Sequence, residues 1–155
     1  MSGGEAQAQD RPTRAGRLYT PELLGLASQL ARFPLSPGDD AEPWSHRGEA
    51  RSRTCGSVVE LGVDLTEAGT IERLGLQVSA CAVGQSSAAI MALVASGKAR
   101  ADIETAASAI EAWLAGDAPL PQWPGFAALE PARAHAGRHG ALLAPWTALT
   151  RALSS

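Results

Sequence analysis

Two cysteines are the side chains of this sequence best suited to chemistry, and their spacing suggests that they share a site. Cys55 opens a predicted strand in Thr54-Cys55-Gly56-Ser57, and Cys81 follows a second predicted strand. Two strands of about ten residues and a turn fill the interval between the two cysteines. Because such a hairpin rises and returns, both thiols are expected at the same end of a sheet.

The surroundings of the two cysteines favour a reactive or metal-binding role. Cys81 precedes a predicted helix, whose free N–H groups and dipole stabilise a thiolate. Arginines alternate with other residues from His46 to Arg53, which predicts a polar edge strand leading to Cys55. That strand is expected to be solvated, and its positive field would also favour a thiolate at Cys55 and attract a partner. The alternative is that both cysteines are small buried residues, as free cysteines often are.

A metal site needs more than two thiolates, since soft metals take three or four ligands. His139, beside Gly140 at the start of the predicted last helix, is the best candidate for a third ligand. It would reach the end of the hairpin if the last helix packs beside the helix that follows Cys81. His135 is a weaker candidate, and His46 is more simply explained as a surface residue.

The sequence pattern predicts an α+β fold that positions these residues, with a three-stranded antiparallel sheet covered by about five helices. The Thr20 hydroxyl and Pro21 begin the first helix, and Pro34 ends it. Alternating apolar residues mark the strands, and apolar residues at helical spacing mark the helices. Residues 1–17 are predicted to be a disordered tail and residues 18–155 a single domain. The expected strands are 46–53, 55–65 and 70–79, and the helical segments are 21–33, 82–96, 101–115, 126–129 (interrupted by Pro131) and 139–153 (kinked or started by Pro145).

The composition of the 155-residue chain argues against several functional classes. Its net charge of −3 is not that of a non-specific nucleic-acid or anionic-membrane binder. No apolar run approaches the ~20 residues of a membrane helix, and the segment from Met1 to Gly16 lacks the apolar core of a signal peptide. We therefore expect a cytoplasmic protein whose thiols stay reduced. The sequence has no GxSxG, HExxH or glycine-rich phosphate loop, which argues against a hydrolase.

Two motifs and their order resemble the IscU/NifU/SufU-type scaffolds of iron–sulfur cluster assembly. Thr54-Cys55-Gly56-Ser57 resembles the Cys-Gly-Asp motif of that family. Cys81-Ala82-Val83-Gly84-Gln85-Ser86-Ser87-Ala88 resembles its second motif, and Ser96-Gly97-Lys98 resembles the continuation. The resemblance spans residues 18–153 and implies an IscU-like fold of the SufE/NifU type.

The chain departs from the family pattern at two positions. Ser57 stands where the family has an aspartate, and a neutral hydroxyl is a weak metal ligand. The third cysteine of the family has no counterpart, because Gly140 or, in another alignment, Ala136 stands near its place. In the family that cysteine is associated with receiving sulfur from a cysteine desulfurase, so the resemblance does not carry that role to this chain.

The resemblance implies a non-enzymatic assembly protein that binds iron through Cys55, Cys81 and His139. The cargo would be a transient [2Fe–2S] cluster, or the site would hold Zn²⁺. The implied partners are a cysteine desulfurase and apo iron–sulfur acceptor proteins, without nucleic acid or membrane. Two alternatives stay open: a zinc-bound sulfur acceptor that stimulates a cysteine desulfurase, and a degenerate interaction module of the same fold without metal.

Overall fold

The structure, a computed structural model, describes residues 18–36, 43–53 and 56–154. The tail expected at residues 1–17 lies outside this range, and so does Cys55. The described elements are α3 (Pro21–Ser28), η1 (Gln29–Arg32), β1 (His46–Arg51), β2 (Val58–Leu65), β3 (Ile71–Ser79), α4 (Ala82–Ala95), α5 (Arg100–Leu114), η2 (Phe126–Ala134), η3 (Ala136–Arg138) and α6 (His139–Leu153), where η marks a 3₁₀-helix.

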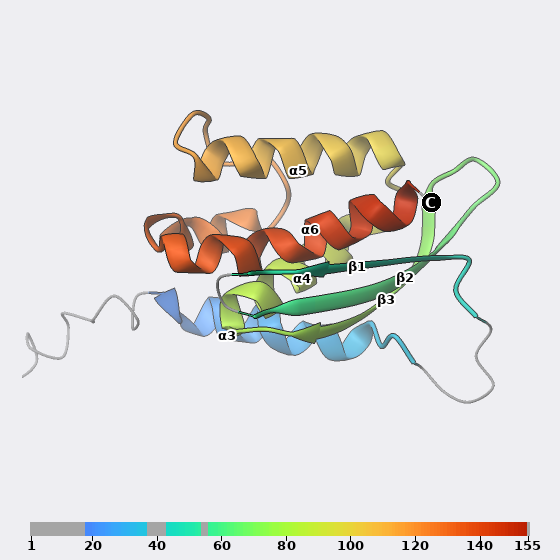
Figure 1. Ribbon diagram of the computed structural model, residues 1–155, viewed down its shortest axis with the longest axis horizontal. Coiled ribbons are helices and arrows are strands. Elements are labelled where there is room, and N and C mark those ends of the chain that lie inside the picture. Colours follow the sequence, from blue (N-terminus) through green and yellow to red (C-terminus); the bar gives the residue numbers. More distant parts are fainter. Residues whose placement is uncertain (1–17, 37–42, 54–55, 155) are drawn as a thin grey trace, which may run out of the picture.

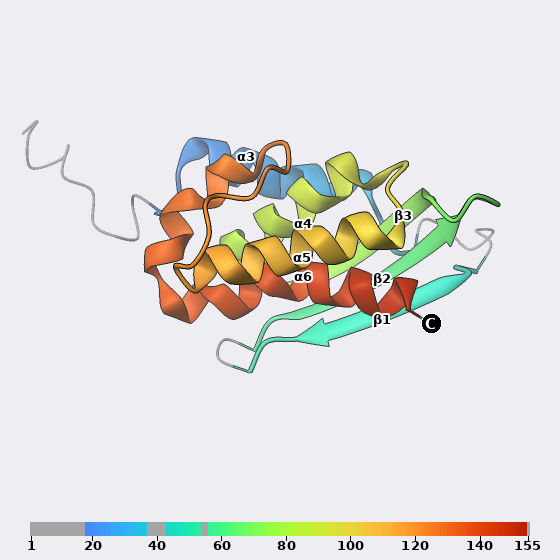
Figure 2. The same ribbon diagram turned by 90° about the horizontal axis from the view of Figure 1, so that it is seen from above.

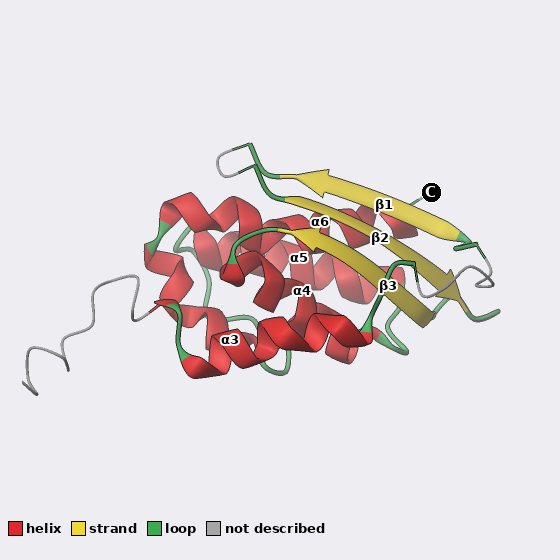
Figure 3. Ribbon diagram, turned by 90° about the horizontal axis from the view of Figure 1, so that it is seen from below, coloured by secondary structure: helices red, strands yellow, loops and turns green. Residues whose placement is uncertain are grey.

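The three strands form one antiparallel sheet in the order β1-β2-β3 (Figure 3). The register pairs Val59 with Val78 and Leu61 with Leu76, so the apolar side chains of β2 and β3 share one face. Val59 and Leu61 are buried there, as the alternation of the sequence predicts. The polar strand β1 lies at the edge of the sheet, which confirms the expected edge strand.

Helices α4 and α6 cover the apolar face of the sheet, while α3 packs against α4 and α5 packs against α6 (Figures 1 and 2). Helix α6 lies close against β1 at Gly48. An added Cβ at Gly48 would clash with the carbonyl oxygen of Ala148 and stand 2.8 Å from the backbone nitrogen of Ala152. The glycine therefore lets the helix backbone rest directly on the edge strand.

The opposite face of the sheet carries a feature that the sequence alone did not predict. Trp44 lies over Gly62 and Gly75, which are paired on β2 and β3, and an added Cβ at either glycine would run into its ring. The guanidinium of Arg73 stacks 4.0 Å from the centroid of that ring and pairs with Asp64 at 2.7 Å. The absence of side chains at two neighbouring glycines thus lets one aromatic ring pack directly on the sheet.

Most element boundaries agree with those expected, and the expected five helical segments are present, the fourth as a 3₁₀-helix. Strand β2 begins at Val58 rather than at residue 55, because Gly56, at φ 69°, belongs to the turn that follows β1. The prediction for Pro131 is wrong: it lies inside η2, since its fixed φ suits a helical turn. Pro145 lies inside α6 and does not start it. None of the described helices is long and apolar enough to cross a membrane.

Candidate functional site

The site expected from the sequence falls at the end of the sheet where β2 begins and β3 ends. Val58, the first residue of β2, pairs with Ser79, the last residue of β3. A tight turn leads into β2, in which Ser52 N–H donates to Ser57 O at 2.8 Å and Gly56 N–H donates to Ser52 O at 3.0 Å. The described neighbours of Cys55 in the chain therefore lie at the same end of the sheet as the start of α4. Cys55 itself is outside the described residues, and its role stays a prediction.

Cys81 is the residue that links β3 to α4. It occupies the N-cap position of α4 with extended backbone angles, φ −68° and ψ 174°. Its side chain makes no capping hydrogen bond, and the residue is partly exposed and carries a free thiol. The structure therefore confirms the expected position at a helix start.

The first turns of α4 and α6 pack against each other beside Cys81. An added Cβ at Gly84 would lie 3.2 Å from the carbonyl oxygen of Ala141, so the two helices meet at a glycine. One turn further on, Ser87 Oγ donates to the carbonyl of Leu142 at 2.6 Å and accepts the indole N–H of Trp146 at 2.9 Å. Small residues thus let the two helices approach closely, and the hydrogen bonds of Ser87 join them.

His139 begins α6, so this packing carries it to the end of the molecule that holds Cys81. Its Nε2 lies 2.7 Å from the carbonyl oxygen of Arg133. A carbonyl only accepts, so Nε2 carries the proton, and in the neutral ring Nδ1 keeps a lone pair for a metal. Arg133 is held in turn by its Nε, which donates to Trp113 O at 2.8 Å. No motif in the sequence marked Arg133 as the residue that orients this imidazole.

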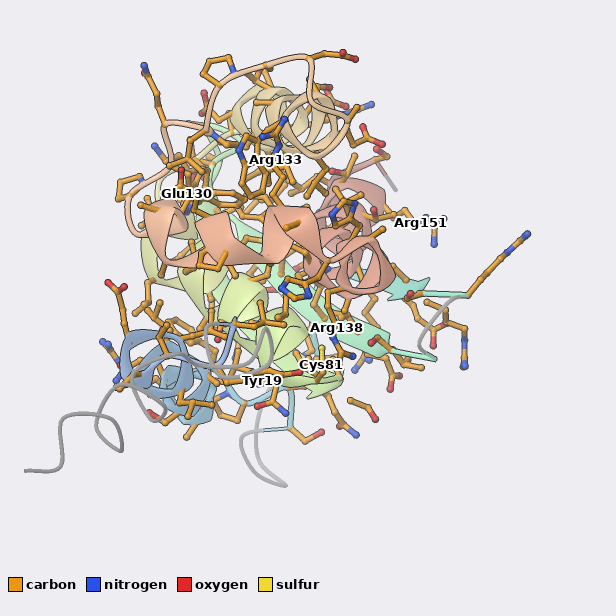
Figure 4. All side chains as sticks on the ribbon, turned by 90° about the vertical axis from the view of Figure 1, so that its left-hand side faces the viewer. Tyr19, Cys81, Glu130, Arg133, Arg138 and Arg151 are labelled. Atoms are coloured by element: carbon orange, nitrogen blue, oxygen red, sulfur yellow. The ribbon has the colours of Figure 1, made fainter. Side chains whose placement is uncertain are left out.

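Figure 4 looks at the molecule from this end. It shows Cys81, from the start of α4, and Arg138, the residue directly before α6, on the side that faces the viewer. The two helices thus begin on one side of the molecule, and α6 packs beside α4 as the third-ligand role of His139 requires.

The other candidates fall elsewhere or change character. His46 pairs with Val63, at the opposite end of β1 from Arg51, and it is half-buried. His135 is the C-cap residue of η2, and its N–H donates to Ala132 O at 3.0 Å. Ser57, which stands where the family pattern has an aspartate, is buried, with 3% of its surface exposed.

The part of the chain that the structure describes contains no group of three or more His, Cys, Asp and Glu side chains that could hold a metal ion. The described donors near the expected site are one thiol, Cys81, and one imidazole, His139. A thiolate and an imidazole suit iron or zinc, and both need further ligands. Cys55 is the candidate in this chain for a third metal ligand.

Several solved structures resemble this chain in fold. The N-terminal part of a nitrogen-fixing NifU-like protein from Brucella abortus is 25% identical, over 92% of this chain and 96% of its own, with a TM-score of 0.76. An iron–sulfur cluster assembly scaffold protein of the SUF system, SufU from Fervidobacterium islandicum, is 20% identical over 88% and 96%, with a TM-score of 0.75. A hypothetical protein is 21% identical over 86% and 97%, with a TM-score of 0.68.

No protein-family model and no curated protein sequence matches this chain. The structural likenesses extend over most of both chains in each comparison, and they confirm the α+β fold that the sequence predicted.

Proposed function

We propose a function that proceeds from the fold, which is that of the IscU/NifU/SufU-type family: this chain is an iron–sulfur cluster assembly scaffold or carrier. It would bind iron or a [2Fe–2S] cluster through Cys55 and Cys81, with His139 as a further donor. It would then hand the cluster to apo acceptor proteins. The observation that carries the proposal is the partly exposed Cys81 at the N-cap of α4, with the first turn of α6 packed beside it.

The cluster is cargo in this proposal, and the residues of the chain bind and orient it. The Cys81 thiolate is a strong ligand for iron, and the carbonyl of Arg133 fixes the ring of His139 so that Nδ1 is the donor. Ser57 is buried and Gly140 has no side chain, so a water molecule or a partner would complete the coordination. A site with fewer protein ligands releases its cargo more readily, which suits a carrier.

A second candidate function is a zinc-holding sulfur acceptor that stimulates a cysteine desulfurase. The mixed thiolate and imidazole donors favour it, because zinc sites combine these two ligand types. Cys55 or Cys81 would then take up the sulfur as a persulfide. In both functions the partners are a cysteine desulfurase and apo iron–sulfur proteins in the cytoplasm, and the chain acts as an assembly protein rather than as an enzyme.

The experiment that tests the scaffold is anaerobic reconstitution of the full chain with Fe²⁺ and sulfide. We expect bound iron, acid-labile sulfide and visible charge-transfer bands, and we expect Cys55→Ser or Cys81→Ser to abolish them. The matched control is His46→Gln, which changes a histidine at the far end of β1 and should leave the spectrum intact. A wild-type chain that stays colourless and free of iron would exclude the scaffold.

Two further measurements separate the alternatives. Mass spectrometry after incubation with a cysteine desulfurase should find sulfur on one thiol if the chain is a sulfur acceptor, and two unmodified thiols exclude that function. If the protein purifies without zinc or iron and chelators do not lower its stability, it is an interaction module without metal, because a ligand bound to the folded state must stabilise it.

A further inference from the structure

The two edges of the sheet differ in what covers them. At the β3 edge, Leu76 N–H donates to the carbonyl oxygen of Phe33 at 2.8 Å, and Pro34 bridges Leu76 in parallel. At the β1 edge, no strand or isolated bridge of the described chain pairs with the backbone, and Figure 3 shows β1 along the margin of the sheet. An edge of this kind presents N–H and C=O groups to a further strand.

A hydrogen bond just beyond β1 shows which residues face this open edge. Ser52 N–H donates to Ser57 O at 2.8 Å, on the side of β2, and continues the register in which Arg51 is opposite Val58. In an antiparallel pair, successive residues alternate between facing the neighbouring strand and facing away from it. The residues of β1 whose backbone groups point to the open edge are therefore Arg47, Glu49 and Arg51.

The side chains of these three residues lie on the face of the sheet away from α6. Ala50 is buried and Gly48 meets α6, so the side chains of the alternate residues point the other way, and all three are exposed. None of the ion pairs of the described chain includes Arg47. Glu49 approaches Arg51 at 3.4 Å, but a pair of two exposed side chains contributes little.

The signs of these charges favour one register for the pairing of two copies of β1. With Gly48 opposite Gly48 on a two-fold axis, Arg47 of each copy lies directly opposite Glu49 of the other. Opposite charges at such positions stabilise an antiparallel pair, and like charges destabilise it. An axis at Arg47 or at Glu49 would oppose like charges, and an axis at Ala50 would place Arg47 opposite Arg53, beyond the end of β1.

We propose that the open edge of β1 is an interface between two copies of this chain, which joins their sheets into one antiparallel sheet. Each Arg47–Glu49 pair exchanges two backbone hydrogen bonds across the axis, because both residues face the edge. Arg151 Nη1 already donates to Glu49 O at 2.9 Å, and a carbonyl oxygen has a second lone pair for the N–H of the other copy.

The interface is short and polar, so the dimer should be weak and reversible. The proposal goes beyond the scaffold function, because the edge contains neither Cys81 nor His139. Charged side chains on an edge strand usually prevent pairing with other chains. Here their alternating signs disfavour the other registers and match the one about Gly48.

The test is sedimentation velocity of the full chain, treated with a chelator, over about a hundredfold range of protein concentration. We expect the mass of the wild type to rise from monomer toward dimer. Arg47→Glu and Glu49→Arg each place like charges opposite one another, so each should raise the dissociation constant by about tenfold or more. An equimolar mixture of the two variants should associate as the wild type does, because every charge at the axis then faces its opposite.

The matched control is Arg100→Glu, which reverses an exposed charge at the start of α5 and should leave the association unchanged. Association of the mixed variants also shows that both of them fold. A wild-type chain that stays monomeric at every concentration would overturn the interface.

Two other outcomes would overturn the pairing of β1 about Gly48. One is that the single variants associate as tightly as the wild type, and the other is that their mixture stays monomeric while the wild type dimerises. Cys81→Ser should leave the association unchanged while it removes iron, so failure of the dimer and failure of the scaffold function are distinguishable.

Discussion

The two sides of helix α6 differ in how completely their side chains are packed and hydrogen-bonded. On the inner side, Ala141 rests on Gly84, and Trp146 and Leu142 are both hydrogen-bonded to the buried Ser87. On the outer side, the helix lines an open hollow against residues 50–53. One helix therefore serves as a packing element on one side, and on the other it carries the proposed ligand His139 at its start. The difference teaches that substitutions on the inner side should change stability, and those on the outer side should change binding.

The largest change in stability is expected at the contact between α6 and β1. Gly48→Ala places a methyl group against the backbone of Ala148 and Ala152, which cannot move without shifting the helix. We expect a loss of about 3 kcal/mol in the free energy of unfolding, measured by denaturant titration. Gly25→Ala is the control, because an added Cβ there meets nothing within 4 Å, and it should stabilise the protein by roughly 0.5–1 kcal/mol. Similar losses from both variants would contradict a close contact at Gly48.

The next effect concerns the hydrogen bonds of Ser87. Ser87→Ala leaves the buried indole N–H of Trp146 without its acceptor, and we expect a loss of about 1–3 kcal/mol in unfolding free energy. Trp146→Phe removes the same bond from the other side. A double-mutant cycle should therefore give a loss smaller than the sum of the two single losses. Strict additivity would show that the bond does not couple these residues.

A substitution on the outer side of α6 should change metal binding and leave stability nearly unchanged. His139→Gln removes an imidazole that is only partly buried, and we expect the unfolding free energy to change by less than about 0.5 kcal/mol. Metal analysis of the same variant should show less bound iron or zinc than the wild type, because the donor Nδ1 is lost. If the metal content stays at the wild-type value, His139 is not a ligand.

The smallest change in stability is expected from a substitution on the face of the sheet that points away from α6. Partial burial acts to raise the pKa of Asp64, but hydrogen bonds from Ser45 and Arg73 outweigh it and hold this pKa below its ordinary value of 3.8. Because the folded state prefers the charged carboxylate, the contribution to stability is complete above about pH 4 and is lost as the pH falls through the lowered value.

Acid titration of the unfolding free energy checks this expectation. Asp64→Asn should remove a small part of the stability lost between about pH 4 and pH 2, and it should leave the remaining pH dependence unchanged. The control Asp102→Asn acts at the start of α5, where the carboxylate accepts a hydrogen bond from Ala99 N–H. If Asp64→Asn leaves the acid-induced loss as large as in the wild type, Asp64 is not held in its charged form.

The sequence by itself determined the order of elements and the position of Cys81. Alternating apolar residues in β2 and β3 specify which face is buried, since the side-chain period of a strand is two. The helix starts and stops followed from local chemistry, as in the Thr20 hydroxyl, which accepts the N–H of Leu23 at 3.1 Å. Such signals depend on neighbours in the chain, and a sequence displays them directly.

Only the tertiary structure decided how distant segments meet. Trp44 packs on Gly62 and Gly75, and the carbonyl of Arg133 accepts a hydrogen bond from the imidazole of His139. No local sequence signal predicts either contact. The hollow between the end of β1 and α6 has the same origin. Arg53 and Arg151 lie far apart in the sequence, and they line one cavity because Gly48 lets α6 rest on β1. Packing between elements sets these contacts, and no periodicity within a single element encodes them.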